Sequence, residues 1–167
     1  MTFSVFKNIN RFAGKWVWLD SISVFCAKYL LYLMLLVLLV FCILQNNLRL
    51  FFYCLASALF ALLAIAKTIY LFYKRQRPAR LKDANVLIPV PKNPSFPSSH
   101  ASFVFGLSFL LLFYNFNIGI VFLFLSIVVG LSRIFCGVHW ARDVLGGAFF
   151  GFVSALIIYG FLNYIKL

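Results

Sequence analysis

The residues best suited to chemistry lie in one short stretch, 132–143. It holds Arg133, His139 and Asp143, in a chain of 167 residues with only 2 histidines and 3 acidic residues. His139 and Asp143 are spaced i, i+4, which on a helix places them one turn apart on one face. A carboxylate there fixes the imidazole tautomer and leaves the other ring nitrogen free to attack. The structural alternative is a histidine and an aspartate that cap a helix start.

Arg133 lies near the end of an apolar segment, and Gly137 is placed to end that helix as a C-cap. With a break at Gly137, Arg133 and His139 are expected to face one another across a small pocket. The guanidinium fork would then suit two phosphate oxygens. The alternative is that Arg133 extends to the membrane interface beside lipid phosphates.

A second motif, Pro97-Ser98-Ser99-His100, precedes another apolar segment. Ser98 is expected to be the N-cap of a helix, so the backbone N–H groups after it point toward an anion and its hydroxyl adds a donor. His100 would then reach a leaving-group oxygen as a general acid. An ordinary helix cap with an incidental histidine is the alternative.

Residues 74–97 form the one long polar connection and carry all 5 prolines. Polar loops of this length are often functional. Lys74 and Arg77 belong to the run of cations that begins it, which suits either phosphate capture or the positive flank of a membrane span. Lys67 lies near the end of the preceding apolar segment, where a lysine is a functional candidate unless it reaches back to the interface.

Composition identifies an integral membrane protein, because the chain is 65% hydrophobic and 11% charged. Its net charge of +12 needs anionic partners, which are expected to be membrane lipids and a phosphorylated lipid substrate rather than nucleic acid. The 3 carboxylates are far apart in sequence, so neither a metal site nor another cofactor is expected. The 4 cysteines show no zinc-site spacing and are interpreted as small buried side chains.

Apolar helices must position these groups, and their pattern predicts an all-α membrane bundle forming a single domain over residues 1–167. An amphipathic helix over 1–20 is expected to lie in the membrane interface. Five spans are expected, or six if the N-terminal helix counts as one. They cover residues 22–44, 48–73, 98–114, 118–136 and 140–164. Since each crossing reverses the side, one face receives Arg77, His100, Arg133, His139 and Asp143.

Three motifs together resemble the signature of the type 2 phosphatidic acid phosphatase superfamily, which reads Lys-x6-Arg-Pro, Pro-Ser-Gly-His and Ser-Arg-x5-His-x3-Asp. In this chain they are Arg77-Pro78, Pro97-Ser98-Ser99-His100 and Ser132-Arg133-x5-His139-x3-Asp143. The third motif matches at every fixed position. The resemblance implies a metal-independent phosphatase in which His139 becomes phosphohistidine, Asp143 orients it and His100 protonates the leaving group. The phosphoryl oxygens would be held by Arg77, Arg133, Ser98 and Ser99.

Two positions depart from that signature. The lysine of the first motif falls on Tyr70, so Lys67, one turn earlier, or Lys74, one turn later, is expected to reach the same phosphate. Ser99 replaces the glycine of the second motif, which makes the approach to the phosphate slightly tighter. The six spans usual in the family exceed the five counted here, and the N-terminal helix is expected to stand in for the first.

Within the superfamily, the small size and the N-terminal pattern around Gly14 and Asp20 are similar to bacterial undecaprenyl-diphosphate phosphatases. This implies removal of the terminal phosphate from a polyprenyl carrier lipid, at the outer face of the bacterial inner membrane. Phosphatidate, phosphatidylglycerophosphate and lipid A phosphates stay open as substrates. A lipid phosphotransferase and a non-enzymatic anchor or transporter subunit that binds anionic lipid are the other classes. The oligomeric state is left open.

Overall fold

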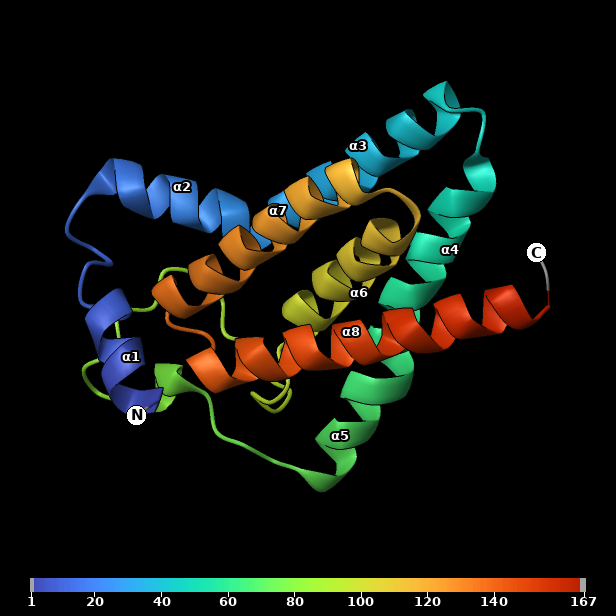
Figure 1. Ribbon diagram of the computed structural model, residues 1–167. Coiled ribbons are helices and arrows are strands. Elements are labelled where there is room, and N and C mark those ends of the chain that lie inside the picture. Colours follow the sequence, from blue (N-terminus) through green and yellow to red (C-terminus); the bar gives the residue numbers. More distant parts are fainter. Residues whose placement is uncertain (1, 166–167) are drawn as a thin grey trace.

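The computed structural model describes residues 2–165 as a bundle of helices, with no strand in that range (Figure 1). The predicted all-α fold is confirmed. The helices are α1 (Thr2–Asn10), α2 (Val17–Lys28), α3 (Leu30–Leu44), α4 (Leu48–Leu59), α5 (Lys67–Phe72), α6 (Ser99–Tyr114), α7 (Phe116–Phe135) and α8 (Ala141–Tyr164). A π-helical segment, η1 (Phe60–Ala66), joins α4 to α5, and the loop after α5 contains a 3-10 turn, η2 (Pro78–Arg80).

The segment expected to form one helix over 1–20 is divided. α1 ends at Asn10, and Gly14 has a φ of 83°, which glycine adopts without strain. The N–H of Gly14 donates to both carboxylate oxygens of Asp20, at 3.0 and 3.1 Å, and α2 begins at Val17. The prediction of a single helix was wrong because Gly14 and Asp20 together stabilise a turn.

The first two expected spans differ in regularity. α2 and α3 meet at Tyr29 with a bend of 56°, so the first apolar segment is a bent pair that begins earlier than expected. α4, η1 and α5 instead continue as one apolar helix from Leu48 to Phe72, as predicted for the second span. Its last residues reach the long loop that carries the cations.

α6 lies in the middle of the bundle, against α4, α7 and α8 (Figure 1). Serine hydroxyls link these helices. Ser57 donates to the carbonyl of Gly106 at 2.8 Å, and Ser154 donates to the carbonyl of Ser57 at 2.6 Å. The hydroxyls of Ser108 and Ser126 lie 2.8 Å apart. Hydrogen bonds of this kind satisfy polar groups where no water is available and align neighbouring membrane helices.

Three helices are long and apolar enough to cross a membrane on their own, namely Leu48–Phe72, Phe116–Phe135 and Ala141–Tyr164, and the bent α2–α3 pair would add a fourth. The chain is therefore an integral membrane protein. These three or four spans are fewer than the five or six predicted. The difference arises because the first segment is bent and α6, with 16 residues, is short.

Close packing of α6 on α8 depends on Gly151. A Cβ atom there would lie 2.6 Å from the Gly106 nitrogen, whereas a Cβ at Gly160 of the same helix would meet nothing within 4 Å. We expect Gly151→Ala to lower the free energy of unfolding by about 1–3 kcal/mol through overpacking. Gly160→Ala is the matched control. Thermal unfolding in detergent should give a lower Tm for Gly151→Ala alone, and equal Tm values would contradict this packing.

Candidate active site

A Schellman motif ends α7 and directs the chain into the short turn before α8. The N–H groups of Gly137 and Val138 donate to the carbonyls of Ile134 and Arg133, at 3.1 and 3.3 Å. Gly137 has a φ of 79°, and a Cβ atom there would lie 2.4 Å from the Asn85 carbonyl oxygen. The predicted break at Gly137 is confirmed, and glycine also allows the long loop to pass against the turn.

His139 lies in this turn and is buried. Its Nε2 is 3.0 Å from Nη1 of Arg77. Because a guanidinium can only donate, Nε2 must accept, which leaves the proton of the neutral ring on Nδ1. Nδ1 lies 3.5 Å from Oδ2 of Asp143 and has no hydrogen-bond partner. α8 begins only at Ala141, so this pair does not share a helical face as predicted; the turn at Trp140 brings the two side chains together.

The Asp143 carboxylate is completely buried and joins several segments. Its Oδ1 pairs with Nη1 of Arg75 at 3.0 Å. Its Oδ2 accepts hydrogen bonds from the backbone N–H of Trp140, at 2.9 Å, and from the hydroxyl of Ser95. The Asp143 carbonyl accepts the N–H of Ser98 at 2.9 Å. Asp143 therefore caps α8, as the structural alternative held, and also faces the histidine.

Arg77 is also buried and uses all of its N–H donors. Nε and Nη2 donate to the backbone carbonyl and side-chain oxygen of Asn93, at 3.1 and 2.8 Å, and Nη2 also reaches the carbonyl of Pro94 at 3.1 Å. Nη1 donates to the carbonyl of Val138, at 3.0 Å, and to His139. Arg77 thus ties the proline-rich loop to the turn that carries the histidine.

Arg133 and His100, both selected from the sequence, lie in the same region. Arg133 is buried on the last turn of α7, where Nη1 donates to the carbonyl of Ala27 at 3.0 Å and Nε has no partner. Its charge is close enough to act on His139. His100 lies in the first turn of α6, within reach of the charges of Arg77, Arg133 and His139. The structure therefore gathers these predicted residues around one imidazole.

The start of α6 is built as predicted. The Ser98 hydroxyl caps the helix by accepting the N–H of Ala101, at 3.4 Å. Tyr70, which stands where the family signature has lysine, donates its hydroxyl to the carbonyl of Pro97 at 2.7 Å and lies 3.2 Å from the hydroxyl of Ser99. Tyr70 therefore contacts the second motif directly.

The two lysines considered as replacements lie in different places. Lys74 lines a cavity of about 450 Å3 together with Tyr70 and Arg77. Lys67 is exposed at the start of α5 and is not among the residues that line this cavity. Within residues 2–165, no three His, Cys, Asp or Glu side chains gather in a way that could hold a metal ion.

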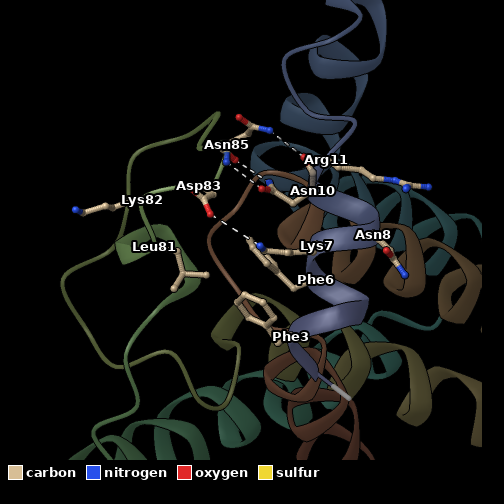
Figure 2. Close-up of a pocket in the computed structure, with 10 residues that line it drawn as sticks. All are labelled: Phe3, Phe6, Lys7, Asn8, Asn10, Arg11, Leu81, Lys82, Asp83 and Asn85. Carbon is tan, nitrogen blue, oxygen red and sulfur yellow. Dashed lines mark hydrogen bonds and ion pairs between the residues drawn. The ribbon is translucent and has the colours of Figure 1, made fainter.

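α1 contacts the long loop that leads to the site, and Figure 2 shows Asn10 of α1 facing Asn85 of that loop. The Nδ2 group of the buried Asn10 donates to the carbonyls of Asn85 and Phe135, both at 2.8 Å, and Oδ1 accepts the N–H of Asn85 at 2.9 Å. Phe6 packs on Trp140, with ring centroids 5.2 Å apart. One buried asparagine thus holds α1, the long loop and the end of α7 together next to the histidine turn.

The model of the PAP2 superfamily matches residues 47–166, which cover all three motifs. The chain belongs to the PAP2 superfamily. The resemblance drawn from the motifs is confirmed, and this PAP2 protein is a membrane phosphatase of that family.

Relatives match along most of the chain. This PAP2 protein is 30% identical to the bacitracin transport permease protein BcrC of Bacillus licheniformis, over 95% of this chain and 79% of the relative. It is 29% identical to the undecaprenyl-diphosphatase BcrC of Bacillus subtilis (strain 168), over 99% and 86%. The crystal structure of LpxE from Aquifex aeolicus superposes with a TM-score of 0.75 at 25% identity, covering 95% of this chain and 94% of that chain.

The sequence reasoning missed three residues that hold the site of this PAP2 protein in place, Arg75, Asn93 and Ser95. Arg75 was visible only as one of several cations in a run, and the other two lie between prolines. The available signal was the placement of Ser95 two residues before Pro97, the first residue of the second motif. No periodic pattern crosses that loop, so their contacts with Asp143 and Arg77 could not be read from spacing.

Burial, together with the charges of Arg77 and Arg133, lowers the pKa of His139 from 6.5 to about 4. The unfolded chain therefore binds this proton first as the pH falls, and the folded state loses stability between about pH 6.5 and pH 4. We expect a loss on the order of 3 kcal/mol from this group. Tm measured across that window should fall less steeply in His139→Asn than in the wild type. Parallel slopes would contradict a buried, neutral histidine.

Proposed function

We propose that this PAP2 protein removes the terminal phosphate of undecaprenyl diphosphate through a phosphohistidine intermediate. The proposal depends chiefly on the neutral, buried imidazole of His139, whose Nε2 faces Arg77 while Asp143 stands behind Nδ1. The name of the Bacillus subtilis relative supports the substrate. A polyprenyl chain also suits a protein whose apolar helices span a membrane.

In the first step, Nε2 of His139 attacks the terminal phosphorus. The bond from phosphorus to the bridging oxygen breaks, and its electron pair leaves with the lipid monophosphate. Asp143 stabilises the positive charge that develops on the ring, because its carboxylate lies beside Nδ1. In the second step, water attacks the phosphohistidine, the nitrogen–phosphorus bond breaks, and inorganic phosphate leaves the free imidazole.

Arginines and a helix start hold the phosphoryl oxygens in this proposal. The positive charges of Arg77 and Arg133 both act on His139, and the free N–H groups of the first turn of α6 lie next to Ser98 and Ser99. Lys74 adds a cation to the cavity that it lines together with Arg77. Lys67 does not line this cavity, so we assign the missing lysine's charge to Lys74.

His100 is the general acid and base. It protonates the leaving oxygen when that oxygen belongs to an alcohol, and it takes a proton from the attacking water in the second step. Its place in the first turn of α6, near His139 and Arg133, supports a role in the site, and the neighbouring positive charges favour the neutral ring that acts as the base.

We further propose five crossings, made by the α2–α3 pair, the α4–α5 helix, α6, α7 and α8, in the bacterial inner membrane. Each loop that carries a site residue then falls on one face, and α1 packs on that face through Asn10. Action on the polyprenyl carrier of cell-wall synthesis places this face outside the cytoplasm.

His139 provides the direct test. Purified protein in EDTA should release phosphate from undecaprenyl diphosphate faster than from phosphatidate or phosphatidylglycerophosphate, assayed side by side. His139→Asn should lower kcat by about 1000-fold or more because the nucleophile is lost. Arg49→Gln, remote from the site in α4, is the control. Activity in His139→Asn, or wild-type activity that EDTA abolishes, would contradict the mechanism.

His100 separates the two kinds of leaving group. A lipid phosphate leaves as a stabilised anion, whereas an alkoxide must be protonated as it leaves. We expect His100→Gln to lower kcat/KM for a lipid phosphate monoester by about 100-fold or more, and for the diphosphate by about tenfold or less. The comparison uses kcat/KM because this ratio reports only the steps up to formation of the phosphohistidine and does not depend on its later hydrolysis. Equal losses on the two substrates would show that His100 is not a general acid.

A further inference from the structure

The Asp143 carboxylate, which lies beside the proposed nucleophile, is bound by several donors other than His139. Oδ2 accepts the hydroxyl of Ser95 and, at 2.9 Å, the N–H of Trp140, and Oδ1 accepts Nη1 of Arg75 at 3.0 Å. Nδ1 of His139 lies farther away, 3.5 Å from Oδ2, and has no hydrogen-bond partner. The carboxylate is therefore held more closely by the long loop and the start of α8 than by the histidine.

Arg75 is the charged member of this set of donors. It pairs with a carboxylate that has no exposed surface, while 21% of its own side chain is exposed. Its guanidinium also lies over the ring of Trp140, 5.6 Å from the centroid, and its carbonyl accepts the N–H of Ser95 at 2.9 Å. The charge of Arg75 is thus fixed at Oδ1, while Oδ2 is the oxygen near His139.

A carboxylate beside an imidazole affects the two steps of the proposed reaction in opposite directions. A stronger pull on the Nδ1 proton makes Nε2 of His139 more electron-rich, and therefore a better nucleophile in the first step. In the second step water gives its oxygen to phosphorus and a proton to His100, and the electron pair of the nitrogen–phosphorus bond returns to Nε2. The ring accepts that pair readily only while Nδ1 keeps its proton. A carboxylate that took this proton would therefore preserve the phosphohistidine.

We propose that Arg75 is a positioning residue that limits the pull of Asp143 on the imidazole and thereby promotes hydrolysis of the phosphohistidine. The inference rests on the proposed function, because it concerns the intermediate formed at His139. Arg75 draws the negative charge of Asp143 toward Oδ1, and Ser95 and Trp140 occupy Oδ2. Nδ1 consequently keeps its proton in the phosphorylated ring, and the imidazole leaves when water attacks the phosphorus.

A direct role in substrate binding is the alternative, because Arg75 also lines the cavity of about 450 Å3 that contains Arg77. The Nη1 group of Arg75, however, donates to Asp143, and its guanidinium lies over Trp140. Arg77 instead directs its Nη1 at Nε2 of His139, the atom that attacks. Arg77 therefore acts at Nε2, whereas Arg75 acts through the carboxylate near Nδ1.

The test compares Arg75→Gln with Arg142→Gln, which removes the same charge from an exposed arginine directly before Asp143. We expect Arg75→Gln to lower kcat for undecaprenyl diphosphate by about tenfold while kcat/KM stays within about threefold, because only hydrolysis of the intermediate becomes slower. Arg75→Lys keeps the charge, so it should recover part of the loss in kcat. Arg142→Gln should match the wild type in both parameters.

The intermediate itself gives a readout that a simple loss of packing would not raise. With substrate labelled in its terminal phosphate, protein quenched in alkali during turnover should carry about threefold or more label in Arg75→Gln than in the wild type. Ser95→Ala removes a neutral donor from the same carboxylate and leaves its charged partner in place, so it should cost less stability. We expect the same changes in Ser95→Ala, with a fall in kcat of about threefold.

The outcomes separate this inference from the proposed function. Parallel losses of kcat and kcat/KM in Arg75→Gln, a loss of orthovanadate inhibition, or no gain in labelled protein would overturn the role of Arg75 and leave the mechanism standing. The same change in Arg142→Gln would show a general effect of charge and would also overturn it. If Arg75→Gln does not fold, Ser95→Ala decides by the same criteria. Activity in His139→Asn would overturn both proposals.

Discussion

The buried carboxylate of Asp143 is the constraint on which the site depends. A carboxylate without solvent contact is strongly unfavourable unless charges and hydrogen-bond donors surround it. Here the donors come from Arg75, Ser95 and the backbone of Trp140, and the imidazole of His139 lies beyond them. Satisfying one buried charge therefore brings the long loop, the histidine turn and the start of α8 to the same place.

The helices alone do not form the site; they leave its parts at one end of the bundle, and polar contacts across the loop complete it. Arg77 fastens the loop to the turn through backbone carbonyls, and Asn10 fastens α1 to both from outside. Each of these hydrogen bonds satisfies a buried polar group that would destabilise the fold if it had no partner. Buried polar contacts, and not only the packing of apolar helices, thereby keep the long loop in position.

Several helices and site residues could be predicted, because the spacing of residues in the sequence reflects the chemistry that they perform. His139, Asp143 and Arg133 were selected from one polar cluster in an apolar chain and Arg77 from the run of cations in the long loop, and they lie together. Apolar runs, with the cap and turn residues that bound them, located α6, α7 and α8 to within a few residues. The reason given for the His139–Asp143 pair was wrong, however, because the helix starts after the histidine and the same spacing is produced by a cap.

Other features could not be read from the sequence. The amphipathic pattern continues across Gly14, so nothing in its period reveals the turn that Asp20 stabilises. Ser95 and Asn93 lie among prolines, where the chain has no repeating geometry, and their partners are far away in sequence. Such contacts depend on the path of the loop in space, which local propensity does not determine.

Every N–H group of Arg77 already has a hydrogen-bond partner, and this affects how His139 can meet an anion. The N–H that points at Nε2 of His139 is the only one of its donors not given to a carbonyl or amide oxygen. An arriving anion can gain a bond from Arg77 only by taking that N–H, and in doing so it frees the lone pair of the nitrogen. This hydrogen bond masks the Nε2 lone pair of His139, so exposure of the lone pair is coupled to the binding of an anion by Arg77.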